Sequence, residues 1–72
     1  MIKLRYNTKA GDSPLKWRVL DEQGKEFLAD RVVIRCLSET TEDVLPSGEI
    51  KHHVTCYGRL IWDGTTAIIE ED

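Results

Sequence analysis

The histidines and cysteines of this chain form the group whose chemistry suits a metal ion such as zinc. His52 and His53 are adjacent, Cys56 follows three residues later, and Cys36 stands apart. Neighbouring residues of a strand point to opposite faces, so the two histidines cannot share one ion there. His52 and Cys56 share a face but lie about 13 Å apart at ~3.3 Å per residue. A site of His52, Cys36 and a carboxylate across strands stays open, but the spacing lacks the close ligand pairs of structural zinc, and we expect no metal or cofactor.

The same cysteines could act as nucleophiles beside a histidine. A reactive thiol needs a helix N-terminus or a nearby cation to lower its pKa, and the sequence predicts no helix. Cys36 is in phase with Ile34 and Cys56 with Val54, a pattern typical of buried, inert thiols. The chain contains no nucleophile motif or glycine-rich phosphate loop. We therefore expect a protein that is not an enzyme and whose thiols are reduced.

Basic residues at every second position are the third feature with chemical meaning. Two segments near the N-terminus alternate lysine or arginine with large apolar residues. If these segments are neighbouring strands, their cations share one face, as in small β-barrels that bind single-stranded nucleic acid. The candidate binding residues are Lys3, Arg5, Lys16, Arg18, His53 and Tyr57. Cross-strand pairing of the cations with Glu26, Glu70 or Glu71 is the simpler alternative.

Charge is distributed unevenly along the chain, whose net charge is -3. Five basic groups against Asp12 alone give residues 1–20 a charge of +4, whereas five basic and twelve acidic groups give residues 21–72 a charge of -7. A negative total argues against indiscriminate binding of nucleic acid or an acidic membrane. We expect a non-enzymatic binding module that joins a protein partner or a second copy through sheet edges. Single-stranded nucleic acid or another anionic ligand on the basic strand face is the alternative.

Period-two alternation dominates the sequence and predicts an all-β fold. The length of 72 residues is that of a single domain, residues 1–72. Six or seven short strands, with a bend at Gly58, predict a small antiparallel barrel or a strongly curved meander. Residues 31–37 are apolar on both sides, which predicts a central or doubly covered strand. Residues 38–48 break the alternation and predict the longest loop, in which residues 41–45 have the composition of one helical turn.

Two glycine-containing turns set the expected register of the hairpins. Gly24 closes a turn at residues 21–25, and the pair Asp63-Gly64 favours a two-residue type I′ turn. The expected cross-strand pairs are Val19 with Phe27, Trp17 with Ala29, Trp62 with Thr65, and Leu60 with Ala67. The expected core residues are Trp17, Val19, Phe27, Ile34, Val54, Leu60 and Trp62.

Location can also be predicted from the apolar runs. No uninterrupted apolar run is longer than three residues, far below the ~20 residues that cross a bilayer. Residues 1–7 alternate apolar and basic side chains and lack the apolar block of a secretory signal. We therefore expect a cytoplasmic protein without membrane contact.

Several segments resemble short bacterial proteins of a family of unknown function. These segments are Lys16-Trp17-Arg18-Val19, Glu26 to Ala29, Val32 to Ile34, and Lys51-His52-His53-Val54 with Gly58. The resemblance covers most of the chain through ordinary strand residues. It implies a bacterial cytoplasmic protein and brings no activity and no site residues with it.

Overall fold

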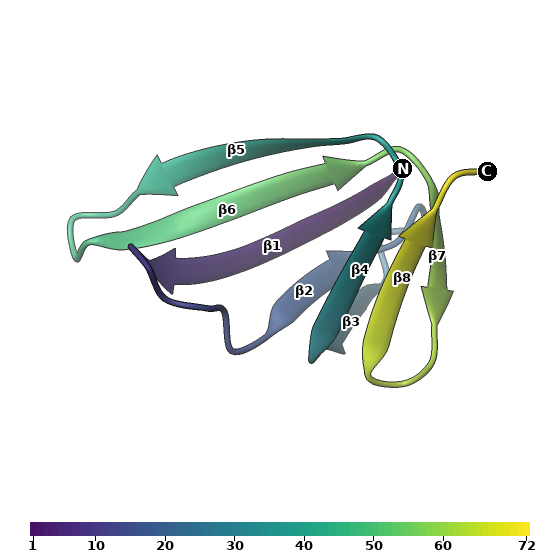
Figure 1. Cartoon of the computed structure of the whole chain (residues 1–72), viewed down its shortest axis with the longest axis horizontal. Helices are drawn as coiled ribbons and strands as arrows, with labels where there is room; N and C mark the ends of the chain where they lie inside the picture. Colours follow the sequence, from purple (N-terminus) through teal and green to yellow (C-terminus); the bar gives the residue numbers. More distant parts are fainter.

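A computed structural model describes residues 1–72 and contains eight β-strands and no helix (Figure 1). The strands are β1 (Ile2–Lys9), β2 (Trp17–Leu20), β3 (Glu26–Ala29), β4 (Arg31–Arg35), β5 (Ser38–Val44), β6 (Glu49–Cys56), β7 (Arg59–Trp62) and β8 (Thr66–Glu70). They form a larger sheet of five strands, β3-β2-β1-β6-β5, and a smaller sheet of three, β4-β8-β7. The all-β prediction is confirmed.

The arrangement of the strands differs from the predicted antiparallel barrel or meander. The larger sheet is antiparallel throughout, but β4 and β8 of the smaller sheet are parallel. Neither sheet closes on itself, because β3 and β5 are the free edges of the larger sheet and β4 and β7 those of the smaller. The strand count of six or seven is also wrong, since residues 38–44 form an eighth strand. The structure contains no helix of the length and apolarity that crossing a bilayer requires.

The hydrophobic core lies between the two sheets, where alternate apolar side chains meet. Its buried residues are Ile2, Leu4, Val19, Ala29, Val54, Cys56, Ala67 and Ile69. Of the predicted core residues, Val19 and Val54 are buried, and the partly buried ones packed against them are Trp17, Phe27, Leu60 and Trp62. Ile34 is 37% exposed, so its assignment to the core is wrong. It lies on β4, which has a neighbouring strand on one side only.

Residues 31–48 depart most from the sequence-based expectation. The predicted central strand, β4, is an edge strand of the smaller sheet. The predicted loop at residues 38–48 contains β5, which pairs with β6 from Ser38 to Val44, and no helical turn forms. Every β5 side chain is exposed, so neither face needs apolar residues and the period-two signal is missing.

One predicted turn is confirmed and the other has a different register. Gly24 has a φ of 80°, and the pairs Val19–Phe27 and Trp17–Ala29 form as expected. At the second turn, Trp62 pairs with Ala67 rather than with Thr65. Leu60 correspondingly pairs with Ile69 instead of Ala67. The shift of two residues leaves every side chain on its expected face.

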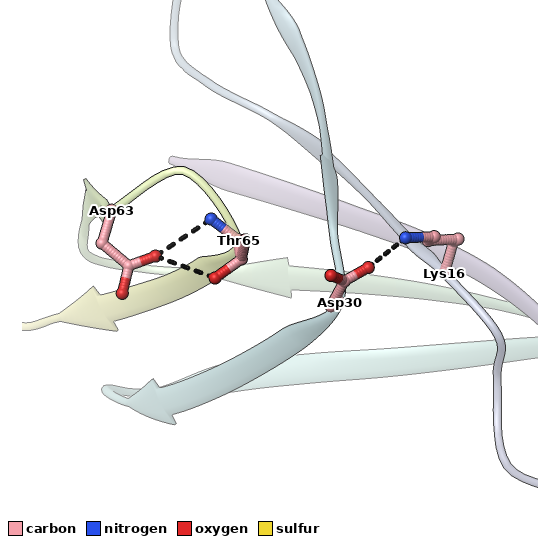
Figure 2. A network of polar contacts seen from close by, with 4 residues as sticks. All are labelled: Lys16, Asp30, Asp63 and Thr65. Carbon is pink, nitrogen blue, oxygen red and sulfur yellow. Dashed lines mark hydrogen bonds and ion pairs between the residues drawn. The ribbon is translucent and has the colours of Figure 1, made fainter.

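The cause of the shifted register is the side chain of Asp63. Its carboxylate accepts hydrogen bonds from the backbone N–H groups of Thr65 (3.0 Å) and Thr66 (2.7 Å), and Figure 2 shows it beside Thr65. Only glycines have positive φ in this chain, so Asp63 does not adopt the conformation that a type I′ turn needs. The side-chain bonds stabilise a longer turn instead.

The chain crosses between the sheets three times, once at Asp30 between β3 and β4 and twice more at places that lie next to each other. Residues 36–37 connect β4 to β5, and residues 57–58 connect β6 to β7. The Tyr57 N–H donates a 2.8 Å hydrogen bond to the Leu37 carbonyl, which joins the two crossings. The expected bend at Gly58 is confirmed, since the chain bends at residues 57–58 between β6 and β7. A Cβ atom at Gly58 would clash with the Glu70 carbonyl oxygen.

Candidate functional site

The outer face of the larger sheet, the face turned away from the core, carries a concentration of basic side chains. On β1, Ile2 and Leu4 are buried in the core, and strand alternation therefore places Lys3 and Arg5 outward. Lys51 extends the same face onto β6, opposite Asn7 of β1. Of the six candidate residues, those on this face are Lys3, Arg5, Lys16, Arg18 and His53.

Arg5 lies at the centre of a row of groups that can carry positive charge. The register places it opposite Arg18 of β2 on one side and opposite His53 of β6 on the other. Like charges directly opposite each other destabilise a sheet. Arg5 has no carboxylate within 4.0 Å, so the protein itself does not neutralise it.

Acidic side chains lie beside the other candidate residues around Arg5. Arg18 Nε lies 3.4 Å from Glu26 Oε1, and Lys16 contacts Asp30 through its ammonium group (Figure 2). His53 Nε2 lies 3.6 Å from Asp43 Oδ2. Of the cross-strand pairings expected from the sequence, the one between Arg18 and Glu26 is therefore present, whereas Lys16 pairs with Asp30 outside the strands.

Other outward cations on the two central strands have no acidic partner. We call them the cationic track, which consists of Lys3, Arg5, Lys9 and Lys51. None of the four forms an ion pair within 4.0 Å, although the acidic groups of β3 and β5 line both edges of the sheet. From Lys3 to Lys9 the track extends about 20 Å at ~3.4 Å per residue. It is therefore a row of cations without ion-pair partners, with carboxylates along both edges and Glu49 opposite Lys9 at one end.

Two shallow depressions lie along the cationic track. The larger has a volume of about 850 Å³. The basic residues that line it are Arg5, Lys9, Lys51 and the ion-paired cations Lys16 and Arg18. The other, of about 400 Å³, is lined by Lys3 and Arg5. Arg5 belongs to both, so the two depressions meet at the residue without a counter-charge.

Aromatic rings are absent from the cationic track. Tyr57 follows β6 at the corner of the sheet, where its hydroxyl donates a 3.1 Å hydrogen bond to Glu39. This bond to a carboxylate raises the pKa of Tyr57. Trp62 lies between the sheets, tilted against Phe27 with ring centroids 5.2 Å apart. The cationic track itself thus offers charge to a ligand but no stacking platform, while the Tyr57 ring at the corner of the sheet is 42% exposed.

The inner face of the larger sheet ends in a cluster of rings beyond the smaller sheet. The Tyr6 ring is stacked on His52 at 4.4 Å and tilted against Trp17 at 4.2 Å. Burial, followed by the charge of Glu42, raises the pKa of Tyr6. His52 Nε2 shares a 2.9 Å hydrogen bond with the Thr8 hydroxyl. These contacts cover the part of the sheet that has no second layer above it.

His52 and His53 lie on opposite faces of β6, as strand geometry requires. The buried Nδ1 of His52 lies 3.2 Å from Glu42 Oε1 but has no hydrogen-bond partner. No group of three or more His, Cys, Asp or Glu side chains is placed to hold a metal ion. The two thiols, in contrast, lie at the adjacent crossings between the sheets, with Cys56 buried and Cys36 partly exposed.

Lys9 and Lys51 are the members of the cationic track that sequence analysis missed. Lys51 alternates with His52, but only the pairing of β6 with β1 shows that it lies beside Asn7. That pairing joins segments more than forty residues apart, as in the pair Asn7–Lys51, and no local pattern predicts it. Comparisons with protein-family models, curated proteins and solved structures found no match. The geometry of the outer face is therefore the basis for a functional proposal.

Proposed function

We propose that this protein is a non-enzymatic binding module whose cationic track binds an extended polyanion such as single-stranded nucleic acid. The observation that carries the proposal is Arg5, which stands between Arg18 and His53 without a carboxylate of its own. A bound phosphate would supply the missing counter-charge. Arginine suits this role because its planar guanidinium forms paired hydrogen bonds with phosphate oxygens.

The shape of the surface supports a linear ligand. The cationic track follows β1 and β6, which are long strands, and apart from Glu49 at its Lys9 end the acidic side chains of the sheet lie on the edge strands on either side. A chain of phosphates along the track avoids these carboxylates, whereas a broad anionic surface would contact them. Without an aromatic platform, binding depends on the backbone phosphates and is independent of base sequence.

Fluorescence anisotropy with a labelled single-stranded oligonucleotide tests the proposal. At a low salt concentration of about 50 mM we expect saturable binding, because the release of counterions favours the complex most strongly in low salt. If four cations each neutralise one phosphate, the logarithm of the binding constant falls with the logarithm of salt concentration with a slope of about -3. Absence of binding in low salt would refute the proposal.

A matched pair of double variants separates the track from overall charge. Arg5→Glu with Lys51→Glu reverses two charges on the track, and Lys25→Glu with Arg31→Glu reverses two outside it. Both variants have the same net charge. We expect the first to lose at least about tenfold in affinity, a loss equivalent to ~1.4 kcal/mol, and the second to bind much more tightly than the first. Equal losses in both variants would show that only total charge matters.

Strand addition at β5 is a second candidate function, favoured by the open edge of that strand. All seven residues of β5 are exposed, and β6 is its only neighbouring strand. Two copies pairing through β5 around Thr41 would set Glu39 against Asp43, which like-charge repulsion disfavours. We propose a basic, extended protein segment as the partner, because its cations would meet these carboxylates.

Nuclear magnetic resonance titration with a peptide of alternating lysine and valine tests strand addition. We expect backbone amide signals of residues 38–44 to shift, and those of the cationic track to stay unchanged. The variant Glu39→Lys with Asp43→Lys should abolish the shifts by reversing the edge charges. Shifts in the wild type that persist unchanged in the variant, or that occur mainly on β3, would contradict this assignment.

A further inference from the structure

We infer that Cys36 and Cys56 form a reversible intramolecular disulfide when the protein meets a two-electron oxidant such as hydrogen peroxide. The geometry behind this inference is the place where the chain twice crosses between the sheets. Cys36 directly follows β4, and Cys56 is the last residue of β6. The proposed disulfide does not depend on what the cationic track binds.

The two crossings hold the cysteines next to each other. Ser38, two residues after Cys36, is the cross-strand partner of Cys56. The hydrogen bond from Tyr57 N–H to Leu37 O, 2.8 Å long, ties together the residues that immediately follow the two cysteines. Both side chains pack in the same core, and neither is already engaged in a disulfide.

The close packing around Gly58 fixes the position of the Cys36 sulfur. This Sγ lies 3.1 Å from where a Cβ atom at Gly58 would stand, two residues beyond Cys56. The absence of a side chain at Gly58 therefore leaves room for the Cys36 thiol beside the end of β6. Burial, followed by the neighbouring Cys36 thiol, raises the pKa of Cys56 to about 11.

The difference in exposure sets the order of the reaction. Cys36 is partly exposed and Cys56 is fully buried, so peroxide reaches Cys36 first. The Cys36 thiolate attacks one peroxide oxygen, which gives a sulfenic acid and releases hydroxide. The Cys56 sulfur then displaces the sulfenic hydroxyl, its proton leaves with that group as water, and the S–S bond forms. In sum, two thiols and one peroxide yield one disulfide and two waters.

The disulfide would connect the end of the smaller sheet's β4 to the end of the larger sheet's β6. Such a link restricts the unfolded chain between residues 36 and 56 more than it restricts the folded one. We therefore expect the oxidised protein to unfold about 10 °C higher than the reduced protein. A reductant such as glutathione returns the thiols and removes this stabilisation.

Intact-mass spectrometry and thiol titration of the folded protein, before and after dilute peroxide, test the inference. We expect the loss of two hydrogens and of both free thiols without dimer formation, and peptide mapping should show the 36–56 link. Intermolecular dimers, oxygen addition without a disulfide, or a disulfide that forms only in denaturant would each overturn the inference. So would an oxidised protein that unfolds at a lower temperature than the reduced one.

Single-cysteine variants test the proposed order. In Cys56→Ser, the sulfenic acid at Cys36 has no partner, and the sulfenic-acid reagent dimedone should label it. In Cys36→Ser, the remaining buried thiol should stay unlabelled over the same time. Circular dichroism establishes that each variant is folded. If Cys56→Ser does not fold, peptide mapping of a brief peroxide pulse on the wild type decides, since early oxidation found only at Cys56 would contradict the order.

Discussion

Gly58 shows how one missing side chain permits the layered arrangement of this protein. Its backbone turns between β6 and β7, where the Glu70 carbonyl oxygen and the Cys36 sulfur lie against it. A glycine inside what would otherwise be one long alternating strand predicts a bulge or bend at this residue, and the structure has a bend there. The reason for glycine, however, is close backbone approach from β8, which depends on a distant strand and is invisible in the local pattern.

Replacing Gly58 with alanine should destabilise the fold by about 1–3 kcal/mol, the usual cost of overpacking a core. The new Cβ would lie 2.1 Å from a backbone oxygen, so β8 must move away from its position. Urea unfolding monitored by tryptophan fluorescence measures the change. Gly64→Ala provides the comparison, because open space surrounds Gly64 and only its φ of 101° opposes a side chain. A smaller effect at Gly58 than at Gly64 would contradict the packing argument.

Among the elements, the turn between β7 and β8 shows where residue types are a poor guide to register. The pair Asp63-Gly64 suits a two-residue turn, yet the Asp63 carboxylate bonds to two backbone N–H groups and lengthens the turn. The turn also bonds to the corner between β3 and β4, since Asp30 N–H donates to the Thr65 carbonyl at 2.9 Å. Which of the two turns forms therefore depends on contacts with a neighbouring element. The local sequence pattern carries no information about those contacts.

The hydrogen bonds from Thr65 and Thr66 lower the pKa of Asp63 below its usual value of 3.8. A lowered pKa in the folded protein means that the ionised carboxylate favours folding. Its stabilisation is therefore present above the unfolded-state pKa and is lost as pH falls through the lower, folded-state pKa. The variant Asp63→Asn keeps an oxygen acceptor but removes the charge. We expect its unfolding temperature at pH 7 to lie roughly a few degrees below that of the wild type.

Thermal unfolding at a series of pH values checks this prediction. The other carboxylates titrate in both proteins, so the difference between wild type and Asp63→Asn reports on residue 63. We expect that difference to shrink toward zero in acid below the usual aspartate pKa. A difference that stays constant with pH would assign the effect to shape rather than to charge.

The central strand β1 and the edge strand β5 together show the limit of period-two reasoning. It correctly orients the side chains of β1, where buried Ile2 and Leu4 alternate with exposed Lys3 and Arg5. It fails for β5, because a strand exposed on both faces needs no apolar side chain. The cationic face was thus predictable for residues on adjoining hairpin strands, whereas Lys51 required the long-range pairing of β1 with β6.

The whole molecule measures 37 × 22 × 21 Å. The larger sheet extends along the longest dimension, and part of it has no second sheet packed against it. Figure 1 shows β1, β5 and β6 extending past the smaller sheet. Burial along β1 falls from Ile2 toward Lys9 accordingly, and rings such as Tyr6 replace the missing layer. The two-layered end thus contains the buried core, and the long end exposes the outer face of the larger sheet that carries the cationic track.

The position of β8 bears on how this chain reaches its native state. β8 lies between β4 and β7, so neither of these strands has a neighbour in its sheet until residues 66–70 are in place. The parallel contact of β4 with β8 closes a connection of about thirty residues, and such non-local contacts slow folding by raising contact order. Until this one five-residue segment docks, the smaller sheet cannot close over the apolar face of the larger one, and Ala67 and Ile69 are missing from the core.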